Sequence, residues 1–351
     1  MNRKDEHVSL AKAFHDKQKN EFDFVRIIHN PLPQIAVSDV DLSTQAVGFT
    51  LSSPFYINAM TGGSEKTKKI NQDLAIVARE ADLMIATGSV SAALKDPSLA
   101  DTYTIMRQEY PHGKIIANIG AGTSVERAQE AIRLFHADAL QIHLNAPQEL
   151  VMPEGDRDFT NWKVLIQETQ TAIDVPLIVK EVGFGMTRET LNDLASLGVH
   201  TVDISGRSGT SFTQIENARR SKRELSYLAD WGQSTVSSLL EANEADTSME
   251  ILASGGIRNA YDIFKALCLG AKAVGLSATI LNHLISNGID DTIEMIEDWK
   301  VQLRRLYLMT GKATTAELTR NPIILSGAPK EWCQACLLYT SDAADELDGV
   351  D

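Results

Sequence analysis

The chain has 351 residues, of which 43% are hydrophobic and 23% are charged, a composition typical of a soluble globular protein. Its formal net charge of −14 argues against a general binder of nucleic acid or of anionic membranes. The N-terminus is charged without an apolar core, and no run of 18 apolar residues occurs. We therefore expect a cytoplasmic protein that neither crosses a membrane nor binds nucleic acid.

The order of elements along the chain predicts a TIM (β/α)₈ barrel. Residues 1–45 predict an N-terminal arm with a helical start, broken by the sequence NPLPQ. Eight short β-rich runs follow, beginning near residues 54, 82, 114, 139, 176, 201, 250 and 273, and segments of helical period fill most of the gaps. Apolar strands alternating with helices indicate a parallel sheet covered on both faces, here over residues 46–335. A doubly wound open sheet is the alternative, but it seldom needs eight repeats.

Two connections are longer than the rest and are expected to lie over the C-terminal mouth of the barrel. They follow the fourth strand (about 146–161) and the sixth strand (206 to about 248), and the second is rich in charge. Active sites of such barrels are built from the loops at this face.

The strand ends are unusually polar. In ALQIHLN, Leu140 and its alternate neighbours would pack on helices, whereas Gln141, His143 and Asn145 would point into the barrel. Other strands end in Ser89, Asn118, Lys180, Ser205, Ser254 and Ser277. Each alone is usually a cap or turn residue, but polar ends converging on one mouth predict a ligand site.

Lys180 places a cation at the end of an apolar strand. A buried lysine needs an anionic or electron-rich partner, and an ion pair with Glu181 or Asp203 is the alternative to a ligand.

Glycine-rich loops predict a phosphate-bearing cofactor. ISGRSGTSF, SGGIRNAYD and GLSA follow the last three strands, where barrels often bind phosphate through backbone N–H groups. Arg258 would add a bidentate donor and Thr210 a hydroxyl. The loop INAMTGGSEKT after the first strand closes beside them and could contact a flat ring. A flavin mononucleotide (FMN) beside Lys180 fits this picture.

The motifs RKDEH, AMTGG, QIHLNAPQE, KEVGFG and SGGIR, in this order, resemble the type 2 isopentenyl diphosphate isomerases. The resemblance runs from the N-terminus to about KEW at residues 330–332. It implies a TIM-barrel enzyme that converts isopentenyl diphosphate into dimethylallyl diphosphate in isoprenoid biosynthesis from mevalonate-derived precursors. It further implies reduced FMN, NADPH as reductant, Mg²⁺, and a homotetramer or larger homo-oligomer.

The resemblance also implies roles for single residues. The residues similar to those that contact FMN are Ala59, Met60, Thr61, Ser89, Asn118, Lys180, Ser205, Thr210, Gly256, Ile257, Arg258, Ser277 and Ala278. The residues similar to substrate ligands are Arg3, Lys4, His7, His143, Asn145 and Gln148. Glu149 resembles the Mg²⁺ ligand, although by itself it could be a solvated loop carboxylate.

The implied chemistry moves a double bond by adding one proton and removing another. Gln148 is a poor acid and base, so we expect it to position the alkene or relay a proton, with the reduced flavin shuttling the proton. Lys180 would stabilise the anionic reduced flavin, and NADPH would only prime the cofactor. Arg3, Lys4 and His7 would form a lid over the diphosphate.

The sequence departs from the family pattern at two points. Many relatives carry an arginine after the Gly88-Ser89 pair, but GSVSAAL has none. GRSGTSF has Ser208 where a glycine is commoner, and it keeps Thr210.

Other functions are weighed by the residues they need. A hydroxy-acid oxidase or dehydrogenase barrel wants a histidine near the arginine of SGGIRNA, and an inosinate-type dehydrogenase wants a cysteine near the sixth strand; neither is present. Gln148, Glu149 and the basic arm argue against a non-catalytic flavin- or phosphate-binding barrel.

The cysteines add no further site. Cys268 lies in an amphipathic pattern as a small hydrophobe, and one C-x-x-C (Cys333, Cys336) is too few for structural zinc. The stretch from Cys336 to Glu346 resembles a translated transposase adaptor of sequencing libraries. We expect residues 336–351 to be a non-native, disordered tail.

Overall fold

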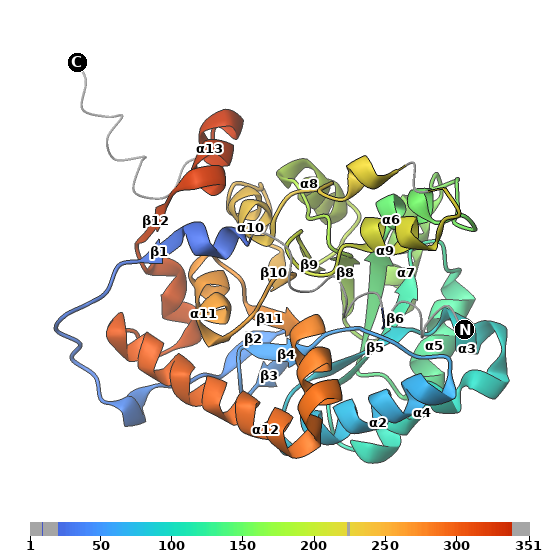
Figure 1. Cartoon of the computed structure of the whole chain (residues 1–351), viewed down its shortest axis with the longest axis horizontal. Coiled ribbons are helices and arrows are strands. Elements are labelled where there is room, and N and C mark those ends of the chain that lie inside the picture. The colour runs from blue at the N-terminus through green and yellow to red at the C-terminus, as the bar shows by residue number, and fades with distance from the viewer. Residues whose placement is uncertain (1–8, 10–19, 223–224, 339–351) are drawn as a thin grey trace.

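Eight parallel strands close into a barrel in this computed structural model, which describes residue 9 and residues 20–222 and 225–338 (Figure 1). The barrel order is β10-β11-β4-β5-β6-β7-β8-β9, so the last strand pairs with the first. The strands are β4 (Phe55–Ile57), β5 (Ile85–Ser89), β6 (Ile115–Gly120), β7 (Ala139–Leu144), β8 (Leu177–Glu181), β9 (Thr201–Asp203), β10 (Glu250–Ser254) and β11 (Ala273–Leu276). The TIM-barrel prediction is confirmed.

Helices cover the outside of the barrel after every strand, and the long connections after β7 and β9 carry extra helices first. The covering helices are α2 (Glu65–Glu80), α5 (Val125–Phe135), α7 (Trp162–Ala172), α8 (Arg188–Ser196), α10 (Thr235–Asn243), α11 (Ala260–Cys268) and α12 (Ala278–Met309); α3 (Ser91–Lys95), η4 (Pro97–Leu99) and α4 (Asp101–Glu109) follow β5. Side chains cap several of them at the start, since Ser64, Thr187 and Ser234 each accept a backbone N–H of the first turn. The long helix α12 is interrupted at Gly288, where φ is +88°.

The two long connections carry helices at the mouth. α6 (Ala146–Val151) follows β7, and α9 (Phe212–Arg219) and η5 (Ser226–Leu228) follow β9. α6 and α9 pack against each other and lie side by side in Figure 1. Side chains of both connections therefore lie close together at the C-terminal mouth of the barrel.

Strand alternation divides the core in two. Leu140, Ile142 and Val179 face outward and pack in the cluster between the strands and the helices. Ile116 and Ile178 face inward and pack in a smaller cluster inside the barrel. The inner cluster fills the lower barrel, so the polar residues higher on the same faces stand on an apolar base.

A hairpin closes the N-terminal end of the barrel. β2 (Thr44–Ala46) pairs with β3 (Phe49–Leu51), and Ala46, Val47 and Leu51 pack into the inner cluster. The N–H of Val47 donates to the carboxylate of Glu250 at 2.7 Å, which fixes the turn to β10. In the described part of the chain, apolar side chains of this hairpin thus close the N-terminal end of the barrel.

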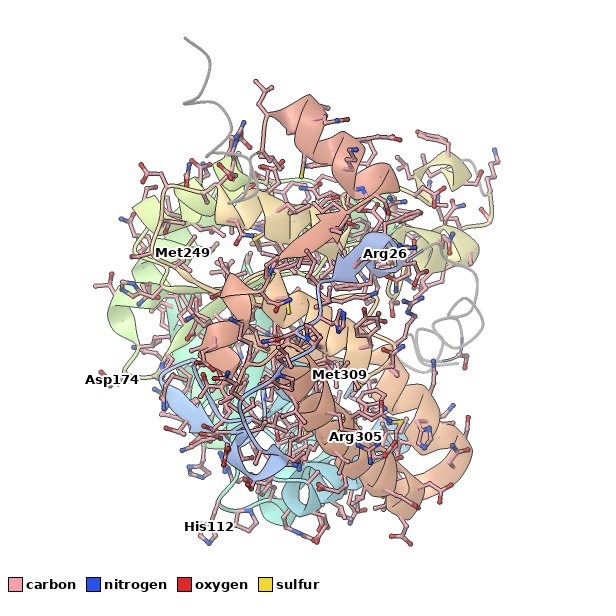
Figure 2. All side chains as sticks on the ribbon, turned by 90° about the vertical axis from the view of Figure 1, so that its left-hand side faces the viewer. Arg26, His112, Asp174, Met249, Arg305 and Met309 are labelled. Atoms are coloured by element: carbon pink, nitrogen blue, oxygen red, sulfur yellow. The ribbon has the colours of Figure 1, made fainter. Side chains whose placement is uncertain are left out.

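The described part of the predicted arm packs on the barrel. It contains η2 (Glu21–Phe24), β1 (Val25–Ile27) and η3 (Val37–Asp39). β1 pairs antiparallel with β12 (Ile323–Leu325), which follows η6 (Thr315–Arg320) and precedes α13 (Gly327–Cys336). Figure 2 shows this side of the molecule, with Arg26 of β1 and Met309 at the end of α12. The two ends of the chain are thus joined by one small sheet.

Several predictions fall at the edges of the described chain. The tail beyond Leu338 lies outside the described residues, so its predicted disorder stays a prediction. Cys333 and Cys336 lie on α13 as free thiols. None of the helices in the described ranges is both long enough and apolar enough to cross a membrane.

Candidate functional site

A buried carboxylate forms the floor of the barrel mouth. Asp203 is fully buried at the end of β9 and accepts hydrogen bonds from the hydroxyl of Tyr56 (3.1 Å) and the amide of Asn58 (2.7 Å). It also accepts from the hydroxyl of Ser254 (2.7 Å) and the backbone N–H of Ser205 (3.1 Å). Donors from three strands thus compensate one desolvated charge.

Lys180 stands beside this floor as the register partner of both His143 and Asp203. Its ammonium donates to the carbonyl of Glu181 (2.6 Å) and to the hydroxyl of Ser205 (3.2 Å). Burial lowers the pKa of Lys180, and the charges of Asp203 and Glu181 act in the opposite direction. The hydrogen bonds thus go to neutral oxygens, and Asp203 serves as a nearby charge. A buried ammonium so placed suits an electron-rich ligand.

The predicted substrate residues after β7 come together through direct hydrogen bonds. Asn145 precedes α6, and its amide donates to the carboxylate of Glu149 (2.7 Å) and to the side-chain oxygen of Gln148 (3.4 Å). Asn145 and Gln148 are both buried. His143, two residues earlier, has Nδ1 3.0 Å from the amide oxygen of Asn118, which orients the imidazole ring.

Glu216 is a site residue that the sequence interpretation missed. It lies on α9 with no exposed surface, and its carboxylate accepts the amide N–H of Gln148 at 2.9 Å. Arg219, one turn later, pairs with Glu216 and also with Glu154 at 2.7 Å. The spacing of Glu216 and Arg219 was a helical signal, but the segment is so rich in charge that its burial could not be inferred.

The glycine loops after β9 and β10 pack backbone against backbone. A Cβ on Gly209 would lie 2.9 Å from the nitrogen of Gly256, and one on Gly255 would lie 2.1 Å from the oxygen of Gly206. Gly255 and Gly256 also have φ of +96° and +74°, which favours glycine. The loop after β9 also contains Thr210, and the loop after β10 contains Ile257. The start of α12 supplies Ser277 and Ala278. Clustered backbone N–H groups at a helix start suit a phosphate.

The side chain of Arg258 is engaged elsewhere. Its guanidinium contacts the carboxylates of Asp23 (2.6 Å) and Asp262 (2.7 Å), and its own backbone N–H donates to Asp262 (3.1 Å). The sequence interpretation gave this side chain to the phosphate. In the structure a phosphate contact would require exchange of these ion pairs, so that role stays a prediction.

The loop after β4 holds an unpaired hydroxyl. Oγ1 of Thr61 is buried and has no hydrogen-bond partner among the residues that the structure describes, which is rare for an interior polar atom. The backbone of Thr61 packs on Gly88, where a Cβ would lie 2.4 Å from its oxygen. Ala59 is tied to the floor through its N–H, which donates to Asn58 (2.8 Å). Met60 is half-buried in the same loop. The unpaired hydroxyl and the glycine cradle fit FMN.

Glu149 is the candidate for Mg²⁺. Its carboxylate accepts from Asn145 and from the N–H of Asp156 (2.9 Å), and it is partly exposed. In the described part of the chain, no three His, Cys, Asp or Glu side chains are grouped to hold a metal. Mg²⁺ commonly binds through one or two carboxylates and substrate phosphates, so a single carboxylate fits this ion.

The diphosphate ligands are the least defined part of the site. Arg3, Lys4 and His7 lie outside the described residues. At the position after Gly88-Ser89, where the family resemblance led us to expect an arginine, Val90 is fully buried. The hydroxyl of Ser89 contacts that of Ser91 at 3.1 Å.

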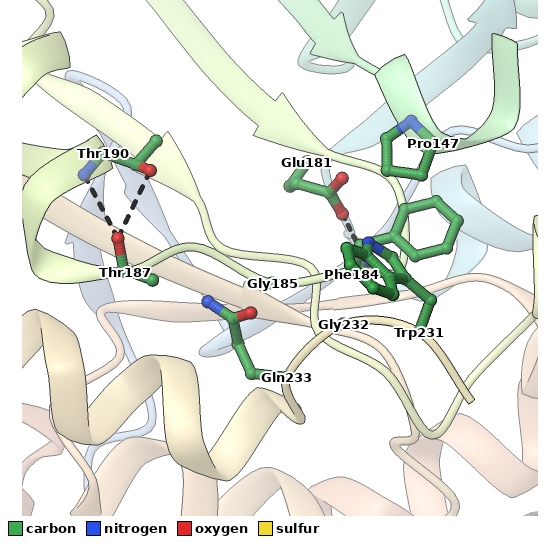
Figure 3. A pocket seen from close by; sticks show the side chains of 9 residues that line it. All are labelled: Pro147, Glu181, Phe184, Gly185, Thr187, Thr190, Trp231, Gly232 and Gln233. Carbon is green, nitrogen blue, oxygen red and sulfur yellow. Dashed lines mark hydrogen bonds between the residues drawn. The ribbon is translucent and has the colours of Figure 1, made fainter. Parts of the chain in front are cut away.

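A cleft of about 400 Å³ lies beside the mouth (Figure 3). Its walls include Pro147, Phe184 and Trp231, with Glu181 at its inner end. The carboxylate of Glu181 accepts the N–H of Phe184, and burial raises the pKa of Glu181 to about 8. Glu181 thus fastens the β8–α8 loop rather than pairing with Lys180.

Ser208 is held at φ +99°, a conformation that favours glycine. Ser208→Gly should therefore raise the free energy of unfolding by about 1 kcal/mol in urea titrations of the cofactor-free protein. The control is Ser38→Gly, at an exposed residue without positive φ, which should be neutral or destabilising. A lower free energy of unfolding for Ser208→Gly than for wild type would contradict backbone strain at Ser208.

Glu181 should make stability depend on pH. Its folded pKa is about 8 against an ordinary value of 4.5, so the unfolded chain releases this proton first. Its contribution is full below pH 4.5 and is lost as pH rises through 8. From pH 5 to 8, wild type should therefore lose free energy of unfolding relative to Glu181→Gln, which has no titrating group here. The difference between the two proteins should change by at most about 1.4 kcal/mol per pH unit. A constant difference across urea titrations at these pH values would show that Glu181 is ionised in the fold.

Comparisons with known proteins identify the family and the fold. Residues 127–325 match the family of FMN-dependent dehydrogenases. Among solved structures, a flavocytochrome b2 variant with pyruvate bound is similar with a TM-score of 0.69 at 20% identity, covering 93% of this chain and 84% of that one. A mandelate oxidase variant is similar with a TM-score of 0.64 at 16% identity, covering 92% of each chain. These two likenesses show the fold.

Sequence relatives are much closer. The isopentenyl-diphosphate delta-isomerase of Latilactobacillus sakei is 53% identical over 92% of this chain and 93% of its own length. Those of Staphylococcus haemolyticus and Staphylococcus aureus are 47% and 46% identical, each over 95% of both chains. The chain belongs to the isopentenyl-diphosphate delta-isomerase family.

Proposed function

We propose that this protein converts isopentenyl diphosphate into dimethylallyl diphosphate with reduced FMN, as a step of isoprenoid biosynthesis. The observation that carries the proposal is the bonded group of Asn145, Gln148, Glu149 and Glu216 at the mouth of a barrel whose glycine loops suit a phosphate. Family membership at 46–53% identity supports the same reaction.

FMN would be held by three parts of the mouth. Its phosphate would meet the backbone of the Gly255–Gly256 loop, the hydroxyl of Thr210 and the start of α12 at Ser277 and Ala278. The loop of Ala59, Met60 and Thr61 would contact the ring, with the unpaired hydroxyl of Thr61 as a donor or acceptor. Ser89, Asn118, Lys180 and Ser205 would line the remaining edge.

The substrate would lie between the flavin and α6. Glu149 would hold Mg²⁺ against the diphosphate, and His143 would donate to a phosphate oxygen. Arg3, Lys4 and His7 would close over the diphosphate and exclude water.

The proton transfers would rest on three groups of the chain and on the cofactor. Reduced FMN, when bound, supplies an acid–base group beside the alkene. Glu216 holds the amide N–H of Gln148 at 2.9 Å, so the direction of that amide is set and its oxygen is on the side of Asn145. Gln148 would position the alkene or pass a proton in concert with Glu216. Lys180 would stabilise negative charge at the flavin edge.

Two alternatives are less well supported. An oxidase of 2-hydroxy acids needs a histidine base in the loop after β10, and residues 255–259 contain none. A non-catalytic barrel would not explain the buried hydrogen bond between Gln148 and Glu216, because burying these polar groups costs free energy.

We further propose that NADPH only primes the flavin, and that the protein works as a homotetramer or larger homo-oligomer. The assay that tests the function measures dimethylallyl diphosphate formed by purified protein with FMN, Mg²⁺ and NADPH, each omitted in turn. Product that requires reduced flavin and Mg²⁺, without stoichiometric loss of NADPH, is expected. NADPH consumed in proportion to product, or bound FMN without any isomer, would contradict the proposal.

Gln148→Ala should lower kcat at least about 100-fold while FMN stays bound, because the amide that orients the alkene is lost. The measurement is initial rate with chemically reduced FMN, together with flavin content after gel filtration. Gln167→Ala, at an exposed residue of α7, is the matched control and should leave the rate unchanged. Full turnover by Gln148→Ala would remove Gln148 from the mechanism.

A further inference from the structure

The segment Asn20–Phe24, here called the arm root, contacts both loops of the candidate phosphate site. It lies between residues 1–19 and β1 and forms the short helix η2. Nothing in its sequence, NEFDF, marks it as part of a cofactor site. Its contacts come from residues more than 180 positions away in the chain.

The first contact fixes the loop after β10. The amide of Asn20 donates to the carbonyl oxygen of Gly256 at 2.5 Å, and Asn20 is 6% exposed. Its side-chain oxygen accepts the N–H of Phe22 at 3.0 Å, so both ends of the amide are used. The carbonyl of Gly256 is thereby turned toward the arm root, in the loop expected to meet the phosphate with its N–H groups.

The second contact fixes the loop after β9. The carboxylate of Glu21 accepts the hydroxyls of Ser234 and Ser237, the latter at 3.1 Å, at the N-terminus of α10. It also pairs with the guanidinium of Arg207 at 3.4 Å, two residues before Gly209. Glu21 is 8% exposed, so these bonds form in a largely dry environment, where they are strong.

Further contacts hold the arm root in place. The ammonium of Lys265 donates to the carbonyl of Phe22 at 2.6 Å, and the ring of Phe22 is 1% exposed. Asp23 pairs with Arg258, although both side chains are well exposed. The buried Glu21 and Asn20 therefore carry more of the coupling than Asp23 does.

We propose that the arm root is a positioning element for the phosphate-binding loops, with Asn20 setting the Gly255–Arg258 loop and Glu21 setting the Arg207–Thr210 loop. The inference rests on the proposed FMN site. Because Glu21 and Asp23 engage Arg207 and Arg258, the phosphate would be bound mainly by backbone N–H groups.

The test compares FMN with riboflavin, which has the same ring but no phosphate. Dissociation constants of both are measured by flavin fluorescence quenching with cofactor-free wild type, Asn20→Ala and Glu21→Gln. Each variant should bind FMN about tenfold more weakly, since a buried hydrogen bond to each loop is lost, and should bind riboflavin as wild type does. Asp23→Asn, at the exposed pair, should change FMN binding less than threefold.

The matched control comes from the opposite, N-terminal end of the barrel. Glu250→Gln removes a carboxylate that, like that of Glu21, accepts hydrogen bonds from other segments, here from the backbone N–H of Val47 and the hydroxyl of Thr201. It should leave the ratio of FMN to riboflavin affinity unchanged. Thermal unfolding of each cofactor-free variant identifies any loss of fold.

The outcomes separate this inference from the proposed function. If wild type fails to bind FMN, the proposed function is wrong. If wild type binds FMN and the two variants bind it equally well or more tightly, the arm root does not position the loops. A parallel loss of FMN and riboflavin affinity would show a general structural role and would also overturn the inference.

Discussion

The buried carboxylate of Asp203 is the interaction on which the rest of the site depends. Desolvating a carboxylate is costly unless donors surround it, and here a tyrosine, an asparagine, a serine and a backbone N–H do so. Two of these donors, Asn58 and Ser205, are joined to predicted flavin contacts. The side-chain oxygen of Asn58 accepts a hydrogen bond from the backbone N–H of Ala59, and the hydroxyl of Ser205 accepts one from the ammonium of Lys180. One carboxylate therefore orients several side chains around the mouth.

The two ends of the proposed flavin site are built in different ways. At the ring end, side chains with fixed rotamers stand on the Asp203 floor. At the phosphate end, glycines let two backbones approach closely, and the nearby arginines are already paired with carboxylates. A backbone cradle discriminates by shape and by the direction of its N–H groups. It therefore suits a compact phosphate without placing a strong net charge beside the diphosphate site.

The sequence predicted the barrel well because its signal is repeated eight times, and a local error in one unit could not change the whole. It also predicted the direction of His143 and Asn145, because alternation along a strand is a local rule. It could not predict the burial of Glu216, which depends on packing of α9 against α6. It assigned the guanidinium of Arg258 to the phosphate, which stays a prediction, and did not foresee the ion pairs of this side chain with Asp262, four residues later, and with Asp23, 235 positions away. The pairing of β1 with β12 was also missed, since each strand has only three residues.

That pairing has a consequence for the order of synthesis. Val25 pairs with Leu325, so β1 lacks its neighbour until nearly the whole chain has left the ribosome. The arm root continues directly into β1, and it contacts loops that are themselves made only after residue 206. The middle strands of the barrel are made before β12, so they can pair with one another before β1 has its partner strand. The arm root of a nascent chain therefore gains its contacts with Arg207 and Gly256 only after these much later residues have been made.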